Sequence, residues 1–221
     1  MNVSQALLQR KSVRAYLDKT VEKEKIELIL EHAKHAPSGV NMQPWDLCVV
    51  SGESKRAIET KLLEAFNGSH DEPMDYEYYP LTWNEPYKTR RRNTGLLMYK
   101  TLDIRREDTE KQHKQWEQNY RAFDAPVVMY FFIDESLEKG SYIDYGMFLQ
   151  SIMLMAEELG LATCTQAALA QYPSIVKEAL DVPKNKKLLC GIALGYEEKN
   201  ALVNSYRTSR IELDEFVKFF Y

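Results

Sequence analysis

Two basic segments at opposite ends of the chain carry residue types that bind phosphate. The first places three cations and a hydroxyl within five residues: Arg10, Lys11, Ser12 and Arg14. The second lies in residues 204–210 and contains Arg207 and Arg210. Arginine binds phosphate through two parallel hydrogen bonds, and serine adds a neutral donor. Either segment alone also fits a solvated charged surface, but together they could surround one phosphate.

Two uncharged segments lie between them and suit a flat, polar ring. Residues 36–45 read Ala-Pro-Ser-Gly-Val-Asn-Met-Gln-Pro-Trp. Gly39 would let the backbone approach such a ring closely, and Ser38 and Asn41 offer short hydrogen-bonding groups. The small residues around Gln166 and Ala167 would expose backbone amides in the same way. An ordinary turn and a core-lining turn are the respective alternatives, because these residue types are common in turns.

The hydrophobic pattern predicts the elements that must position these segments. We expect helices at 22–36, 54–66, 95–122, 145–159 and 173–180, strands at 46–50, 126–133 and 187–196, and a short extended piece at 161–165. Strand 126–133 is apolar throughout and should be buried on both faces. Helix 145–159 is apolar nearly all round, so part of it should form a subunit interface. This order predicts one α+β domain over 1–221 with a mixed sheet.

Residues 67–94 break this regular pattern. They combine Gly68 and three prolines with several tyrosines and Trp83. We interpret them as an irregular excursion, because long loops inside compact domains are often active-site lids. With the following helix, in which Trp116 and Tyr120 are expected to face inward, the lid would cover about 67–122.

Composition excludes several classes of protein. The net charge of −4 gives no attraction to nucleic acid or acidic membranes. The three cysteines and four histidines show no ligand spacing, so no metal is expected. The chain shows neither a signal peptide nor an apolar run that could span a membrane. We therefore expect a cytoplasmic protein with no membrane or nucleic-acid partner.

In this order, the segments resemble the nitroreductase family of FMN enzymes. The matching pieces are Arg10 to Arg14, Ala36 to Trp45, Glu158 to Leu161, Gly195-Tyr196 and Arg207 to Arg210. The resemblance implies a three-layer α+β fold, with a central, mostly antiparallel sheet flanked by helices. It also implies an intertwined homodimer with two FMN molecules at the subunit interface.

The resemblance further implies roles for individual residues. Arg10, Ser12 and Arg210 would lie near the FMN phosphate, and Lys11 and Arg207 would also bind the cofactor. Arg14 would lie beside flavin N1 and O2, where a cation stabilises negative charge. The partner subunit would contribute Pro37, Ser38, Gly39 and Asn41. The backbone of Gln166 and Ala167 would touch N5 and O4, and no side chain would act as a catalytic acid or base.

The implied activity is electron transfer from NADH or NADPH through flavin N5 to a nitroaromatic, quinone or similar acceptor, by a ping-pong mechanism. The lid looks most like that of nitrobenzoate-type members. Reductive dehalogenation of an aromatic substrate such as an iodotyrosine stays open, since Glu77, Tyr79 and Lys88 have suitable types. Consumption of the flavin with oxygen and flavin binding without turnover are further alternatives. Single-stranded nucleic acid could bind Arg90 to Arg92, but the overall acidity argues against it.

Overall fold

A sheet of four antiparallel strands forms the centre of the protein. The computed structural model describes residues 1–221. The strand order is β1-β2-β4-β3, with β1 at Asp46–Ser51, β2 at Val127–Asp134, β3 at Ala162–Gln166 and β4 at Lys186–Gly195. Every pairing between these strands is antiparallel. The mostly antiparallel sheet implied by the resemblance is therefore confirmed, and the expectation of a mixed sheet was wrong.

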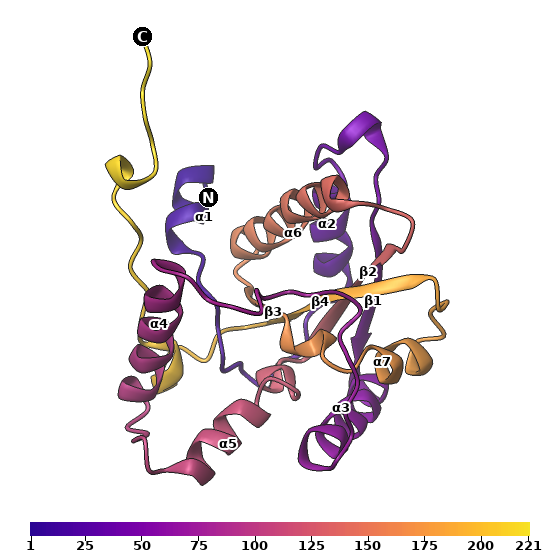
Figure 1. Ribbon diagram of the computed structural model, residues 1–221. Helices are drawn as coiled ribbons and strands as arrows, with labels where there is room; N and C mark the ends of the chain where they lie inside the picture. Colours follow the sequence, from indigo (N-terminus) through magenta and orange to yellow (C-terminus); the bar gives the residue numbers. More distant parts are fainter.

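Helices cover both faces of this sheet and complete a three-layer fold (Figure 1). Helices α2 and α6 pack together on one face, and α3 and α7 pack together on the other. Helices α4 and α5 lie to one side of the sheet (Figure 1). The helices are α1 (Val3–Gln9), α2 (Lys23–Ala33), α3 (Gly52–Asn67), α4 (Tyr87–Thr101), α5 (Thr109–Glu117), α6 (Lys139–Glu158) and α7 (Pro173–Ala179).

Strand β2 divides the hydrophobic core into two halves. Val128, Tyr130 and Phe132 point into the half beneath α3 and α7. The alternate residues, from Val127 to Ile133, point into the half beneath α2 and α6. Successive side chains of a strand point to opposite faces of the sheet. Apolar residues from Val127 to Ile133 therefore bury both faces of the strand. The prediction of a strand buried on both faces is confirmed.

The region expected to form one helix at 95–122 contains two shorter helices. Helix α4 begins at Tyr87 and ends at Thr101, and α5 covers Thr109–Glu117. Asp103 adopts a left-handed backbone conformation between them, with φ of 50°, which ends regular helix geometry. The irregular excursion therefore ends at residue 86 rather than 94. Trp116 is also 51% exposed, so the expectation that it faces inward was wrong, whereas Tyr120 is buried.

Helix α1 was not predicted, although the sequence carries its N-terminal signal. The Asn2 side chain accepts a hydrogen bond from the backbone N–H of Gln5, and the Gln5 side chain accepts one from the backbone N–H of Asn2. This reciprocal pair is a capping box. It starts a helix too short for hydrophobic periodicity to reveal.

Helix α6 is not fully covered within one chain. It begins at Lys139, six residues earlier than predicted, and buries Tyr145, Phe148 and Ile152 against the sheet. Apart from the buried Ala156, its other apolar side chains are only partly covered, and Ile143 is 69% exposed. None of the helices combines the length and apolar character needed to span a membrane. The cytoplasmic location stays a prediction.

We expect Gly191→Ala to lower the free energy of unfolding by about 1–3 kcal/mol, as overpacked core substitutions do. A Cβ at Gly191 would lie 2.5 Å from Cδ1 and 2.9 Å from Cβ of Leu169. Urea unfolding followed by circular dichroism measures the change. Gly140→Ala is the control, because no heavy atom lies within 4 Å of a Cβ there and alanine favours helix. Equal stability of the two variants would contradict the prediction.

Candidate cofactor site

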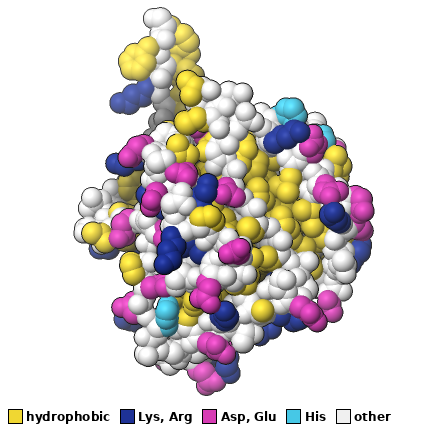
Figure 2. All heavy atoms as spheres, turned by 90° about the vertical axis from the view of Figure 1, so that its right-hand side faces the viewer, with side chains coloured by type: hydrophobic (Ala, Val, Ile, Leu, Met, Phe, Trp, Pro, Cys, Tyr) yellow, Lys and Arg dark blue, Asp and Glu magenta, His cyan; other side chains and the backbone are white.

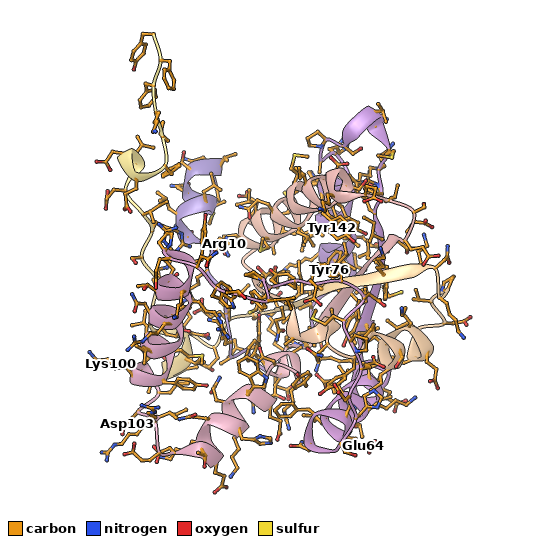
Figure 3. All side chains as sticks on the ribbon, in the orientation of Figure 1. Arg10, Glu64, Tyr76, Lys100, Asp103 and Tyr142 are labelled. Carbon is orange, nitrogen blue, oxygen red and sulfur yellow. The ribbon has the colours of Figure 1, made fainter.

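A polar cavity of about 350 Å³ lies where the two ends of the chain meet. Its wall brings together six of the residues predicted from the two basic segments. Figure 3 shows Arg10 beside the N-terminal end of α4, whereas Lys100 lies at the C-terminal end of that helix. The wall consists of Leu7, Leu8, Arg10, Lys11, Ser12, Arg14, Thr94, Tyr206, Arg207, Thr208 and Arg210.

The positive charges of this cavity repel one another. Burial lowers the pKa of Arg10, and the nearby cations Arg210 and Arg207 lower it further. A group whose charged form is disfavoured in this way is stabilised when an anion enters. Arg207 and Arg210 donate hydrogen bonds only to backbone carbonyls and to Thr208. Neither arginine forms an ion pair, although the negative charge of Glu157 acts on Arg10 and Arg207. Cations outnumber this one acid, and the cavity suits a phosphate.

The buried side chain of Asn204 holds the two ends of the chain together. It is 2% exposed. Its Oδ1 accepts a hydrogen bond from the Arg14 backbone N–H at 2.7 Å. Its Nδ2 donates to the carbonyls of Ala15 and Glu198, both at 2.9 Å. Because all three partners are backbone groups, Asn204 fixes the course of the chain on both sides of the cavity.

Lys11 and Arg14 differ in how their charges are used. The Lys11 ammonium lies 2.7 Å from the Glu197 carboxylate and donates to the Asn204 carbonyl at 2.6 Å. Arg14 has no carboxylate partner, and its Nη1 donates to the Tyr206 hydroxyl at 3.1 Å. Arg14 thus retains its charge for a ligand, whereas Lys11 already has a partner. That Lys11 binds the cofactor stays a prediction.

The end of β3 carries an unpaired acceptor next to this site. Gln166 is 5% exposed, and its Nε2 donates to the Asn119 carbonyl at 3.0 Å. Its Oε1 is buried without a hydrogen-bond partner, a state that costs free energy unless a donor is supplied. Gln166 and Ala167 lie outside the cavity wall. They follow Thr163, which pairs with Ser12 and Val13, so the strand leads from the cationic cavity to this acceptor.

The loop of residues 37–43 lies far from the cavity within one chain. Gly39 donates its N–H to both carboxylate oxygens of Asp144, at 3.2 Å each. Near the cavity, the amine of Met1 contacts Glu158 at 2.7 Å. Asp144 and Glu158 are fourteen residues apart on α6, roughly 20 Å along the helix axis. Pro37, Ser38, Gly39 and Asn41 therefore do not line the cavity of their own chain.

This loop has an unusual backbone. Val40, Asn41 and Gln43 adopt left-handed conformations, with φ of 47°, 59° and 50°. Such conformations are costly for a β-branched residue, and they concentrate at ligand clamps. Val40 is also 95% exposed. A strained loop with an exposed apolar tip fits a contact made outside its own chain.

We expect Asp144→Ala to weaken cofactor binding about 5- to 30-fold, because losing a charge-assisted acceptor costs roughly 1–2 kcal/mol. The substitution removes the acceptor of the Gly39 N–H, and the loop loses its fixed position. Flavin fluorescence titration measures the affinity. Asp144→Asn retains one acceptor and should lie between the two. Equal affinity of all three proteins would show that Asp144 does not position the loop.

Sequence reasoning missed five residues at or near the site. Asp144 had a readable signal, because it is the only acid in the long apolar stretch of α6 that precedes Glu157 and Glu158. Leu7 and Leu8 depend on α1, which the capping box indicates. Asn119 and Thr94 had no sequence signal, because only tertiary packing brings them to β3 and the cavity.

The fold and the site define a three-layer α+β protein with a cationic cavity. No group of three or more His, Cys, Asp or Glu side chains is placed to hold a metal ion. The chain belongs to the nitroreductase family, whose sequence pattern it matches over residues 7–196.

Individual relatives agree with this family over almost the whole chain. The nitrobenzene nitroreductase of Ectopseudomonas oleovorans is 35% identical over 98% of this chain and 96% of its own. The 4-nitrobenzoate reductase of Pseudomonas putida is 36% identical over 95% and 92%. The crystal structure of an FMN- and NADPH-dependent nitroreductase from Sphigopyxis sp. strain HMH superposes with a TM-score of 0.96 at 35% identity, covering 100% of both chains.

Proposed function

We propose that this protein is an FMN-dependent nitroreductase that takes electrons from NADPH or NADH and reduces a small aromatic acceptor. The observation that carries the proposal is the cavity in which Arg10, Ser12, Arg14, Arg207 and Arg210 meet from both ends of the chain. The named relatives support it, because two reduce nitroaromatic compounds and the third requires FMN and NADPH.

The residues present fit FMN. Arg10, Arg207 and Arg210 would hold its phosphate, since three arginines without an ion-pair partner in one cavity suit a dianion. Arg14 would set a positive charge beside the ring, which favours electron uptake. The buried Gln166 Oε1 lacks a donor, and a bound ligand could supply one. When bound, FMN supplies the chemistry of accepting electrons from a nicotinamide and passing them to a second substrate in a ping-pong sequence.

The chain contributes binding and orientation rather than acid–base catalysis. Asn204 fixes Arg14 and the C-terminal segment, and Lys11 with Glu197 ties the same two segments together. We also propose that residues 1–221 act as one domain whose segment 67–122 covers the site. Thr94 of that segment already lies in the cavity wall.

The site is proposed to need a second copy of the chain. The loop at 37–43 is too far from its own cavity but free to reach that of a partner, as the resemblance implies. Exposed apolar side chains on α6 and on the C-terminal tail support such an interface, since large exposed apolar patches mark contact sites. Phe216, Phe219 and Phe220 are 62%, 65% and 90% exposed. Figure 2 shows this tail projecting from the body.

We expect a dimer whose two sites each use both subunits. Sedimentation velocity at micromolar concentration should give twice the mass of the chain. Arg10→Met and Asp144→Ala damage opposite walls of a shared site. Unfolding and refolding a mixture of these weakened variants should therefore restore part of the activity, because mixed dimers contain one intact site. A monomer, or a refolded mixture no more active than its components, would overturn the proposal.

The activity itself has a direct test. Purified protein should be yellow and release FMN on heating. It should oxidise NADPH or NADH only when an acceptor is present. An anaerobic panel of nitroaromatic compounds, quinones and halotyrosines identifies the acceptor, and fastest turnover with a halotyrosine would favour the dehalogenase alternative. Colourless protein that gains no flavin on titration would contradict the proposed function.

A further inference from the structure

The turn that precedes β2 has a backbone that most side chains avoid. Ala122, Phe123 and Asp124 adopt left-handed conformations in succession, with φ of 48°, 56° and 59°. Glycine adopts this region readily, whereas for a bulky residue such as phenylalanine it is an outlier. Ala122 and Phe123 are also buried. Such conformations persist only where the surrounding structure enforces them, and they concentrate at active sites.

Contacts on both sides of the turn hold Phe123 in this conformation. The backbone N–H of Phe123 donates to the Gln118 carbonyl at 2.8 Å. The next carbonyl, that of Asn119, accepts a hydrogen bond from Gln166 Nε2 at 3.0 Å, which ties the turn to the end of β3. The Phe123 side chain is 4% exposed and belongs to the half of the core beneath α3 and α7. Its ring is therefore fixed in both position and direction.

The face of this ring lies against the guanidinium of Arg14. The distance from Arg14 Cζ to the centre of the Phe123 ring is 6.0 Å. A cation is attracted to the face of an aromatic ring up to about this separation. The left-handed turn thus directs a buried ring at the one arginine that is expected to lie beside the flavin ring.

The guanidinium of Arg14 has few other restraints. The Arg14 backbone is fixed separately, because its N–H donates to Asn204 Oδ1 at 2.7 Å. In the side chain, Nη1 alone makes hydrogen bonds, to the Tyr206 hydroxyl at 3.1 Å and to the Ser12 carbonyl at 3.4 Å. Two hydrogen bonds from one atom let the guanidinium plane pivot about that atom. The Phe123 ring supplies the second restraint.

We propose that Phe123 is a positioning residue, whose ring holds the Arg14 guanidinium in the orientation that sets the reduction potential of bound FMN. The inference rests on the proposed function, in which Arg14 places a positive charge beside the flavin ring. A cation there favours the reduced form, because reduction adds negative charge to the ring. Coulombic stabilisation falls with distance. A guanidinium that pivots away therefore loses part of its effect while keeping its charge.

The test is the midpoint potential of bound FMN in Phe123→Leu, measured against a reference dye without oxygen in protein saturated with FMN. Leucine removes the ring face but keeps the site apolar. We expect the preference for reduced over oxidised FMN to fall about 3- to 10-fold, as the loss of a cation–ring contact predicts. This change lowers the potential by about 14–30 mV, because a tenfold change in a two-electron equilibrium is about 30 mV.

Phe132→Leu is the matched control. It removes another buried ring from the same half of the core, and no cation lies over that ring. The control should lose stability, as core truncations do, but its potential should equal that of the parent.

A double-mutant cycle with Arg14→Met separates positioning from a general loss of packing. In the Arg14→Met protein, Phe123→Leu should no longer move the potential, because no guanidinium is left to position. Phe123→Met, with a more adaptable side chain, gives the same comparison if the leucine variant does not fold. An unchanged potential, an equal shift with and without Arg14, or an equal shift in Phe132→Leu would overturn the inference. Parent protein that binds no FMN would instead reject the proposed function.

Discussion

Replacing Arg10 with methionine is expected to weaken FMN binding about 10- to 100-fold, because hydrogen bonds to a charged group contribute roughly 1.5–3 kcal/mol. Arg10 is half-buried in the wall of the cationic cavity. The positive charges of Arg207 and Arg210 repel its own charge. Methionine retains the length and apolar stem of the side chain. The substitution therefore removes the charge with little loss of packing.

The measurement is the dissociation constant of FMN from fluorescence quenching, at two salt concentrations. Affinity should fall with salt in the parent and fall less steeply in the Arg10 variant, since salt screens ionic contacts. Arg106→Met is the control, because it makes the same charge change at an exposed position outside the cavity wall. Similar losses in both variants would mean that net charge, not the cavity, governs binding.

Asn204→Leu is expected to lower the free energy of unfolding by about 3–6 kcal/mol, since each unsatisfied buried polar group costs roughly 1–3 kcal/mol. Leucine has a similar size but cannot hydrogen-bond. It would leave the N–H of Arg14 and the carbonyls of Ala15 and Glu198 without their partner. FMN affinity should fall as well, because the two basic segments would no longer be held together.

Denaturant unfolding and flavin titration on the same preparation measure both effects. Asn200→Leu is the control four residues earlier, where the side chain is exposed and the recorded hydrogen bond is made by the backbone N–H. That variant should change stability by less than about 0.5 kcal/mol, as surface substitutions usually do. A loss of stability in Asn204→Leu with unchanged FMN affinity would separate this asparagine from the site.

The patterns that sequence reveals well in this protein are those set by local chemistry. Strand β2 was predicted because seven apolar residues in succession, from Val127 to Ile133, leave no polar face. The two basic segments were predicted as one phosphate site because their residue types suit the same ligand, and the fold brings them into one cavity. The boundary between α4 and α5 was missed. It depends on a left-handed backbone conformation at Asp103, and no glycine or proline marks that turn in the sequence.

The sequence by itself determined the α+β class and the residue types of the cationic cavity, and its resemblance to the family determined the mostly antiparallel sheet. Tertiary structure alone decided how each residue is used. It pairs Lys11 with Glu197 while leaving Arg14 without an acid, and it places the 37–43 loop at the far end of α6 from the cavity of its own chain. Ion pairs and distances join residues far apart in sequence, and local propensity carries no information about such partners.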